Sequence, residues 1–330
     1  MIPETKKSVV ERALQSAFGT KEFQDIHQLT AGLSTALIYR IVVLDKPYLL
    51  RIITRTDAIG DLSHELAGMQ PASDAGIAPC IRYASKEDRI LITDFIEAKP
   101  FPMREAAIQL PVTIKRVHSL PPFHNRLIYL ERGDGFIRKF QSEKILPENM
   151  TADLIRQYER IKSVYPWNEK DLVSCHNDMK PENIIYDGSR PWLVDWEAAF
   201  LNDRYLDLSM VANFVVTNDD EEKEYLERYS GKEATEYQLA QFFLMRQILH
   251  LLYGTFLLSL VAGSGTTIDL NLSKEDFREF HNGMWTGKIS LAGNEARQQY
   301  AFVHLEQMRR NLQLKRFEDS LRIIADNPLS

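Results

Sequence analysis

The chain has 330 residues, which is long enough for two domains of roughly 100 to 200 residues each. Its formal net charge of -6 argues against a broad surface for nucleic acid, because such surfaces are basic, and suits a small molecule, including a cationic one. Its two cysteines, Cys80 and Cys175, are too few for a disulfide scaffold and lack metal-ligand spacing, so we expect reduced thiols in a cytoplasmic protein.

The first part of the chain contains patterns for a helix and a hairpin. Residues 7–18 place apolar side chains on one helical face, which predicts an opening helix. Residues 37–44 and 48–53 are rich in β-branched and aromatic residues. The intervening Asp45-Lys46-Pro47 has the composition of a turn, so the two runs predict a β-hairpin.

A second helix and further strands complete this region. The helix is expected to begin at Leu62 and to be closed by Pro71 and Gly76. Strand character returns over residues 89–101, where prolines interrupt it. These patterns predict a small β-rich N-lobe over residues 1–97.

Beyond these prolines the sequence is mostly helical, which predicts a larger C-lobe over residues 98–330. The helical patterns cover residues 103–119, 151–163, 220–229, 236–262 and 292–325. The most apolar window, Leu249–Gly263, is shorter than the roughly 20 residues that span a bilayer. We therefore expect a buried helix and no membrane span.

Two features of the C-lobe allow two interpretations each. The acidic run at residues 218–227 could attract a polycation, but Asn218 followed by carboxylates is typical of a helix start. Aromatic residues could cage a quaternary ammonium ion by cation–π attraction or could belong to the core. These aromatic residues are Tyr253, Phe256, Trp285 and Tyr300.

The densest polar chemistry lies in residues 174–199, "SCHNDMKPENIIYDGSRPWLVDWEAA". Two short apolar runs within it are joined by "DGSRP", which predicts a β-hairpin. If Asn183 precedes the first strand and Asp195 follows the second, strand pairing carries both back toward Asp178. Carboxylate and carbonyl oxygens suit Mg²⁺, and an aspartate that is not a ligand can take a proton from a hydroxyl. These are the components that phosphoryl transfer needs.

These residues also resemble a known set of motifs. His176-Asn177-Asp178 followed by Asn183, and then Asp195-Trp196-Glu197, resembles the H-x-D-x-x-x-x-N loop and metal-binding D-x-x of the protein-kinase-like superfamily. The chain is most similar to the aminoglycoside phosphotransferase and choline/ethanolamine kinase family, over roughly residues 25–215. The resemblance implies an α+β, bilobal protein-kinase-like fold, with a small β-rich N-lobe, a larger mostly helical C-lobe and ATP between them.

The resemblance also implies roles for individual residues. Asp178 would be the catalytic base, and Asn183 and Asp195 would bind Mg²⁺. Lys180 is a candidate contact to the γ-phosphate. His176 would hold the loop without acting as an acid or base.

Further upstream, "LTAGLSTALIYRI" resembles the family's phosphate loop, with Gly32, Ser34 and Thr35 offering backbone N–H groups. Gly32 could equally be an ordinary hairpin glycine. Arg51 stands where the superfamily has its phosphate-pairing lysine, and a guanidinium can bind phosphate bidentately. Glu65 is placed to pair with Arg51, although such a pair could also be a surface ion pair of little energetic value.

Two other segments complete the resemblance. Residues Thr93, Asp94 and Ile96 fall at the connection between the lobes, where related folds hold adenine through backbone hydrogen bonds. Asp207 in "RYLDLSMVANF" would be a structural anchor of the C-lobe, and Ser209 departs from the alanine of the related segment.

We predict an ATP-dependent phosphotransferase with an alcohol group as acceptor. His-Asn-Asp and Asp-Trp-Glu favour a choline- or ethanolamine-like amino alcohol; an aminoglycoside or sugar-like metabolite is the alternative. A protein kinase is disfavoured, because Asn177 and Glu197 replace the arginine of H-R-D and the glycine of D-F-G, and no A-P-E segment follows. A catalytically silent nucleotide-binding module is the remaining alternative; it usually lacks one of the three polar residues that are all present here.

Overall fold

The computed structural model describes residues 2–29, 36–54, 62–125, 129–168, 171–272 and 275–327. The chain forms two compact units, which we call the first and the second unit. The first unit consists of Met1–Phe101 and Glu182–Ala199. The second unit consists of Pro102–Pro181 and Phe200–Ser330. The segment Glu182–Ala199 therefore clusters with the N-terminal residues, whereas our predicted division at residue 97 leaves it in the helical lobe.

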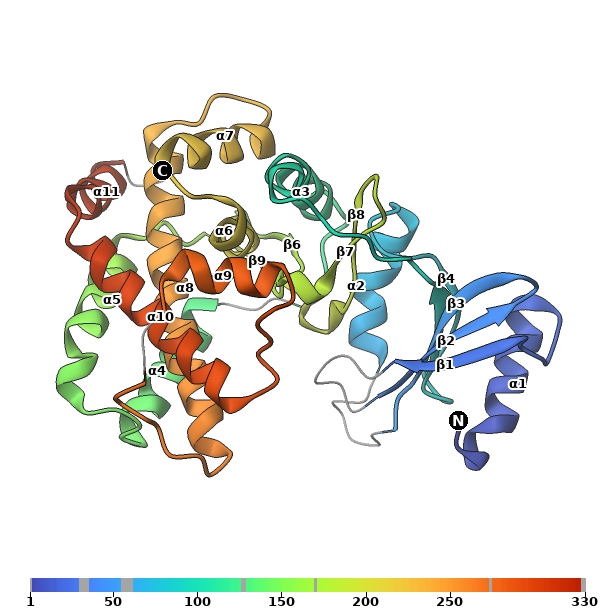
Figure 1. Cartoon of the computed structure of the whole chain (residues 1–330). Coiled ribbons are helices and arrows are strands. Elements are labelled where there is room, and N and C mark those ends of the chain that lie inside the picture. The colour runs from blue at the N-terminus through green and yellow to red at the C-terminus, as the bar shows by residue number, and fades with distance from the viewer. Residues whose placement is uncertain are drawn as a thin grey trace. The chain divides into compact units, whose positions relative to one another are not determined.

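The first unit is built on a five-stranded antiparallel sheet with the strand order β1-β2-β3-β5-β4 (Figure 1). Its strands are β1 (Asp25–Leu29), β2 (Leu37–Val43), β3 (Lys46–Ile52), β4 (Ile81–Ser85) and β5 (Ile90–Asp94). Two helices accompany it, α1 (Glu4–Phe18) and α2 (Leu62–Asp74). Alternate residues of β2 and β3 are buried and join residues of α1 in one apolar core: Tyr39, Ile41, Val43, Leu50, Ile52, Val10, Ala13 and Leu14.

The predicted hairpin between β2 and β3 is present, but its turn lies one residue earlier. Leu44 and Asp45 have φ angles of 49° and 63°, and Lys46 already pairs with Val43. Two consecutive residues with positive φ make the tight turn whose twist matches that of antiparallel strands. Pro47 is consequently part of β3, not of the turn.

The first unit also differs from our prediction at Pro71. This proline lies inside α2 and does not end it. A proline inside a helix removes one N–H donor and crowds the carbonyl four residues earlier, so a helix that continues past it, as α2 does, loses stability but need not end. The carbonyl of Pro71 accepts a bond from Ala75 N, and Gly76, with a φ of 64°, follows the helix end.

The hairpin of β7 (Ile184–Tyr186) and β8 (Pro191–Leu193) belongs to the first unit. Leu193 N donates to Ile77 O at 3.0 Å, and Lys99 N donates to Tyr186 O at 2.7 Å. The ring of Tyr186 also stacks on Phe101, with centroids 4.2 Å apart. These backbone bonds and the ring contact explain why the hairpin clusters with this unit.

The second unit is mostly helical (Figure 1). Its helices are α3 (Met103–His118), α4 (Tyr129–Ser142), α5 (Ala152–Val164), α6 (Arg204–Val215), α7 (Asp219–Ser230), α8 (Glu236–Gly263), α9 (Phe277–Trp285), α10 (Asn294–Leu312) and α11 (Lys315–Asp326). A two-stranded antiparallel sheet joins β6 (Val173–Cys175) to β9 (Phe200–Asn202). We did not predict this sheet, because its strands have three residues each and little pattern.

Helix α8 is the centre of this unit and contacts α4, α5, α6, α10 and α11. By length and composition alone it could cross a membrane, but 72% of its most apolar window is buried inside the protein. Such a helix is hydrophobic on all sides because other helices surround it. The prediction of a buried helix at Leu249–Gly263 is confirmed.

The helical pattern over residues 292–325 corresponds to two helices, not to one. Helix α10 ends at Leu312 and α11 begins at Lys315, with Leu314 in an extended conformation and 50% exposed. The residues after the break bury one face of α11 through Phe317, Leu321 and Ile324. The apolar spacing continues across the break, so periodicity alone could not locate it.

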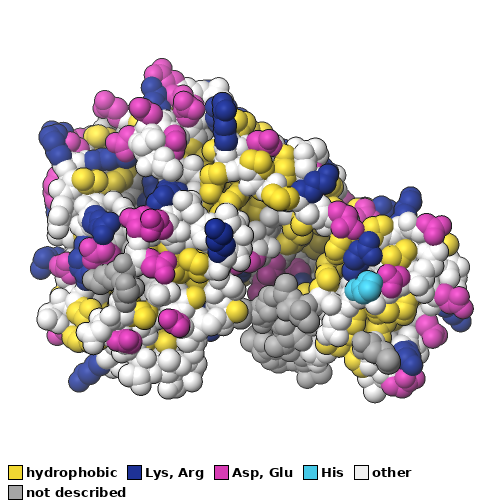
Figure 2. Space-filling view, in the orientation of Figure 1, with side chains coloured by type: hydrophobic (Ala, Val, Ile, Leu, Met, Phe, Trp, Pro, Cys, Tyr) yellow, Lys and Arg dark blue, Asp and Glu magenta, His cyan; other side chains and the backbone are white. Residues whose placement is uncertain are grey.

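The acidic run forms the start of α7, as predicted. The Asn218 side chain accepts a hydrogen bond from Glu221 N at 2.9 Å, which caps the helix. Asp219, Asp220, Glu221 and Glu222 occupy the first turn, and acidic side chains gather over α7 in Figure 2. Carboxylates at this end interact favourably with the helix dipole.

Candidate active site

A buried aspartate of α6, Asp207, holds the loop that carries Asp178. The Asp207 carboxylate accepts hydrogen bonds from His176 N and Asn177 N, both at 2.8 Å. Asn177 has a φ of 62°, a conformation that asparagine tolerates better than most residues. The expected role of Asp207 as a structural anchor is confirmed, and His176, which is fully buried, belongs to the same support.

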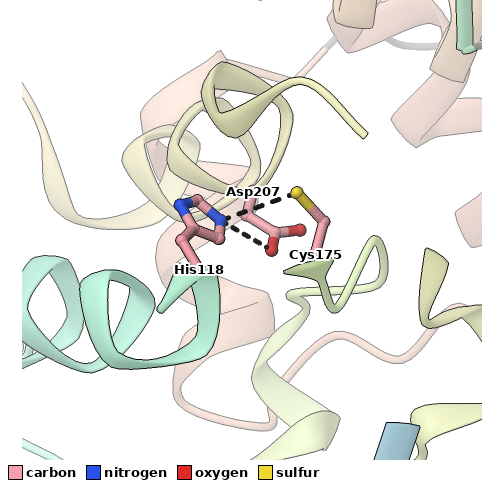
Figure 3. A group of neighbouring side chains, drawn as sticks. All are labelled: His118, Cys175 and Asp207. Carbon is pink, nitrogen blue, oxygen red and sulfur yellow. Dashed lines mark hydrogen bonds and ion pairs between the residues drawn. The ribbon is translucent and has the colours of Figure 1, made fainter. Parts of the chain in front are cut away.

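Figure 3 shows two more side chains at this anchor, His118 from the end of α3 and Cys175 from β6. His118 Nε2 lies 3.2 Å from an Asp207 oxygen and 3.6 Å from the Cys175 sulfur. Burial alone would raise the pKa of Asp207, but the hydrogen bond and charge of His118 and the amide of His176 hold that pKa below its ordinary value. We did not predict His118 as part of this support, since no local pattern marks it.

The cluster of His118, Cys175 and Asp207 has residue types that bind metals. Burial, and then the charges of Asp207 and Asp203, raise the pKa of the Cys175 thiol well above its ordinary value. A thiol that stays protonated is a poor metal ligand. The hydrogen bonds already account for the proximity of the three side chains, so we interpret them as structural.

Asp178 and Lys180 form an ion pair on the loop. Lys180 Nζ lies 2.6 Å from an Asp178 oxygen, and both side chains are about one-third exposed, at 38% and 33%. Lys180, two residues after Asp178, thus places its ammonium group against the carboxylate of the predicted base. Both residues belong to the second unit.

Asn183 and Asp195 lie at the same end of the β7–β8 hairpin. Asn183 immediately precedes β7, and its carbonyl accepts a hydrogen bond from Val194 N at 3.0 Å. Asp195 directly follows Val194 and has a left-handed backbone conformation, with a φ of 65°. Asn183 is buried, and both residues belong to the first unit. The hairpin thus brings together two of the three polar residues.

Arg51 of β3 and Glu65 of α2 form a buried ion pair. Arg51 Nη1 lies 2.5 Å from Glu65 Oε1, and the two side chains are 14% and 7% exposed. The interpretation as a surface pair is therefore wrong. Arg51 Nε is buried and has no partner among the residues that the structure describes. A buried donor without a partner is costly unless a ligand satisfies it.

The surroundings of Glu65 also connect this pair to the hairpin. Burial raises the pKa of Glu65; Arg51 lowers it, and the nearby charges of Asp195 and Glu197 raise it again, so the net shift is upward. Helix α2 contacts the turn Trp196–Ala198, which follows Asp195. The first unit therefore gathers a guanidinium and several carboxylates in one place. Glu197 is a member of this group whose role the sequence did not indicate.

The predicted adenine segment lies at the end of β5. Thr93 is buried and pairs with Leu49 and Ile81 in the sheet. Asp94 N donates to Cys80 O at 2.9 Å. The Asp94 carboxylate forms an ion pair with Arg82 at 2.7 Å. The sheet therefore already uses the polar groups of Asp94, whereas Ile96 lies beyond the last strand residue.

Two other predictions have different outcomes. The predicted phosphate-loop residues Gly32, Ser34 and Thr35 lie outside the described residues. The four aromatic residues of the C-lobe pack into ring contacts: Tyr253 contacts Tyr300, Trp285 is linked to Tyr300 through Phe214 and His281, and Phe256 contacts Phe136. Tyr300 is buried, which agrees with the interpretation as core.

Protein LicA from a strain of Haemophilus influenzae is 31% identical to this chain over 136 residues, which are 38% of this chain and 51% of that protein. The chain spans about half the length of the curated relatives it matches.

Two solved structures cover nearly the whole chain. A choline/ethanolamine kinase family protein from Mesorhizobium loti has a TM-score of 0.69 at 19% identity and covers 97% of this chain and 99% of its own. Spectinomycin phosphotransferase, in complex with ADP and spectinomycin, has a TM-score of 0.56 at 15% identity and covers 90% and 98%. These similarities confirm the predicted α+β, kinase-like fold class.

The model of the phosphotransferase enzyme family matches residues 25–243 of the chain. This range includes Arg51 and Glu65, the loop of Asp178, the β7–β8 hairpin and Asp207, which are the residues described above. The resemblance that the motifs indicated is thereby confirmed, and the chain belongs to the phosphotransferase enzyme family.

Proposed function

We propose that this protein transfers the γ-phosphoryl group of ATP to a hydroxyl group of a small molecule. The observation that carries the proposal is the group of Arg51, Glu65, Asn183 and Asp195 in the first unit. It combines a guanidinium that can bind phosphate with oxygen donors that suit a hard cation. In this proposal the first unit binds the nucleotide, and the second unit supplies the base and the acceptor site.

Arg51 supports the nucleotide half of the proposal. Its Nη1 is held by Glu65, while its buried Nε lacks a partner among the described residues. A phosphate oxygen would satisfy this donor with a charge-assisted hydrogen bond. Glu65 would fix the direction of the guanidinium. The adenine contact would fall to Ile96, because the sheet uses the backbone N–H of Asp94.

Asn183 and Asp195 suit Mg²⁺, because one offers an amide oxygen and the other a carboxylate at the same end of a hairpin. A bound Mg²⁺ ion would neutralise charge on the phosphates. Asp178 would accept the proton of the acceptor hydroxyl. The hydroxyl oxygen would then bond to the γ-phosphorus while the bond between that phosphorus and ADP breaks. Lys180 now pairs with Asp178, and we propose that it turns to the γ-phosphate when ATP binds.

The acceptor that we propose is a choline- or ethanolamine-like amino alcohol. The Asn177 and Glu197 variants of the motifs favour it, and the Mesorhizobium loti structure belongs to a choline/ethanolamine kinase family. An aminoglycoside or sugar-like metabolite is the second candidate, because spectinomycin phosphotransferase has the same fold. A cytoplasmic location, where ATP is available, is part of the proposal.

The test combines one substitution with a panel of acceptors. ATP turnover is measured with choline, ethanolamine, an aminoglycoside and a hexose, and we expect choline or ethanolamine to be phosphorylated. Asp178→Asn should then lower turnover by about 10² to 10⁴-fold while nucleotide binding persists, because only the proton acceptor is lost. Lys139→Asn on α4 is the control. Phosphorylation of a peptide alone, or near-normal turnover of Asp178→Asn, would contradict the proposal.

A further inference from the structure

The second unit contains a cavity of about 660 Å³ that the proposed function does not use. It lies where the end of α3, the start of α6, the end of α7 and the start of α8 meet. Neither Asp178 nor Lys180 lines it. Its volume falls in the range of roughly 300 to 1,000 Å³ that is common for sites of small molecules.

The charges around this cavity favour an anion. Three cationic side chains line it: Lys115, Arg204 and Lys232. None of the three forms an ion pair with a carboxylate in the part of the chain that the structure describes; Lys115 Nζ donates a hydrogen bond to Ser230 O at 2.9 Å. The acidic lining residues are Asp171 and Asp203, and the second already accepts hydrogen bonds from Tyr165 Oη at 2.9 Å and Tyr205 N at 2.7 Å. The first turns of α6 and α8 also line the cavity, and their dipoles add positive potential.

The other lining residues favour a flat ring. Trp167, Tyr205, Tyr229 and Tyr237 all line the cavity. The hydroxyl oxygen of Tyr237 is buried and has no hydrogen-bond partner among the described residues. Aromatic walls bind planar apolar groups, and an unpartnered phenol can donate to a phosphate or carboxylate. We propose that this cavity binds a small aromatic anion, a ring that carries a phosphate or carboxylate group.

A chain of hydrogen bonds leads from this cavity to the catalytic loop. Tyr229 Oη lies 2.8 Å from His118 Nδ1, and both residues line the cavity. His118 Nε2 in turn lies 3.2 Å from the Asp207 oxygen that accepts His176 N (Figure 3). The His118 tautomer that donates to Asp207 accepts the Tyr229 proton at Nδ1. A ligand that takes up the Tyr229 hydroxyl therefore alters the bond to His118, and through it the support of the two residues before Asp178.

The binding test uses phenyl phosphate as the probe, with phenyltrimethylammonium and benzyl alcohol as cationic and neutral counterparts. Affinity is measured by calorimetry at low salt, with ADP and Mg²⁺ in excess to occupy any nucleotide site. We expect saturable binding of phenyl phosphate alone. The double variant Lys115→Gln/Lys232→Gln should weaken it about tenfold, because it removes two positive charges, and Tyr237→Phe about fivefold, because it removes a hydroxyl donor.

Lys139→Gln is the matched control, since its side chain is exposed on α4 and does not line the cavity. Its affinity for phenyl phosphate should equal that of the unchanged protein. Tighter binding of the cationic probe, no saturable binding of phenyl phosphate, or equal affinities in all variants would overturn the assignment of an anion site. These outcomes do not depend on the reaction that we propose, because binding is measured without turnover.

The connection to the loop has its own readout, the hydrogen exchange of the His176 and Asn177 amides. Saturating phenyl phosphate should change their exchange rates by about threefold or more, because both amides depend on Asp207. In Tyr229→Phe, which lacks the hydroxyl, the probe should still bind but the change should disappear. Exchange rates that stay constant in the unchanged protein, or that change equally in Tyr229→Phe, would overturn this connection.

Discussion

The first unit buries Glu65 beside the guanidinium of Arg51, and the second unit buries Asp207 beside the imidazole of His118. The pKa values of these two carboxyl groups shift in opposite directions. Glu65 in the first unit has a raised pKa although Arg51 lies 2.5 Å away, because burial and the charges of Asp195 and Glu197 outweigh the guanidinium. Asp207 in the second unit has a lowered pKa, because His118 and a backbone amide outweigh its burial. The fold therefore stabilises the ionised form of Asp207 and destabilises the ionised form of Glu65.

Such a difference is expected between a carboxylate with a structural role and one that takes part in ligand binding. A carboxylate that accepts several fixed donors contributes to stability at neutral pH. A carboxylate whose pKa is raised by its neighbours is costly at neutral pH, and such groups concentrate at functional sites. The comparison thus supports a structural role for Asp207 and a ligand-related role for Glu65.

The largest expected effect comes from removing the structural carboxylate. Asp207→Ala should lower the free energy of unfolding by about 3 to 5 kcal/mol, because the buried donors of His118, His176 and Asn177 lose their acceptor. Urea unfolding followed by circular dichroism measures this loss. A loss below about 1 kcal/mol would mean that the anchor is dispensable.

The second expected effect is acid sensitivity of the second unit. His250, His281 and His304 are fully buried on α8, α9 and α10, and burial lowers the pKa of each, for His281 to about 3. Their folded pKa values lie below the unfolded value of 6.5, so their contribution to stability is present above pH 6.5 and is lost as the pH falls below it. Together they should cost up to about 4 kcal/mol between pH 7.5 and 5.5.

This prediction is checked with unfolding curves at a series of pH values. In the variant His281→Gln, the slope of the unfolding free energy against pH below pH 6.5 should be smaller by about 1.4 kcal/mol per pH unit, because one titrating group is missing. Glu65 works in the opposite direction, since a raised carboxyl pKa adds stability as the pH falls. An unfolding free energy that stays constant down to pH 5.5 would show that these histidines titrate normally.

The third prediction concerns Glu65, for which we propose a role in nucleotide binding. Glu65→Gln should change the free energy of unfolding by no more than about 1 kcal/mol, because the amide keeps an acceptor for Arg51 and the charges of Asp195 and Glu197 remain nearby. ATP affinity should nevertheless fall, since the guanidinium loses its charged partner. Asp88→Asn, which removes the exposed ion pair with Arg12, is the control in the same unit. A destabilisation of 3 kcal/mol or more would make Glu65 structural as well.

The sequence predicted local features better than distant contacts. The β2–β3 hairpin and the start of α7 depend on neighbouring residues, and both are present. The pairing of β6 with β9 joins residues that are far apart in the sequence, such as Val173 with Asn202 and Cys175 with Phe200, through strands of three residues without a pattern of their own. Periodicity also continued from α10 into α11 across a break that the extended backbone and the exposure of Leu314 mark.

The candidate site shows the same division. The motif order predicted the pairing of Arg51 with Glu65, which the structure confirms, and the placement of Asn183 and Asp195 at one end of a hairpin, which the structure shows. The catalytic and metal-binding roles of Asp178, Asn183 and Asp195 stay predictions. The motif order did not identify His118, which reaches Asp207 from a sequence distance of 89 residues. A hydrogen bond over that distance depends on how α3 and α6 pack, and no local pattern records such packing.

The smallest expected effect lies at the surface of the second unit. Asn218→Ala should lower the free energy of unfolding by about 1 kcal/mol, because Glu221 N loses the side chain that caps α7. Asn218→Ser, which keeps a capping oxygen, should lose only a few tenths of that amount, and turnover should be unchanged in both variants. If Asn218→Ala costs as much as Asp207→Ala, the energetic distinction between a surface cap and a buried anchor in this unit fails.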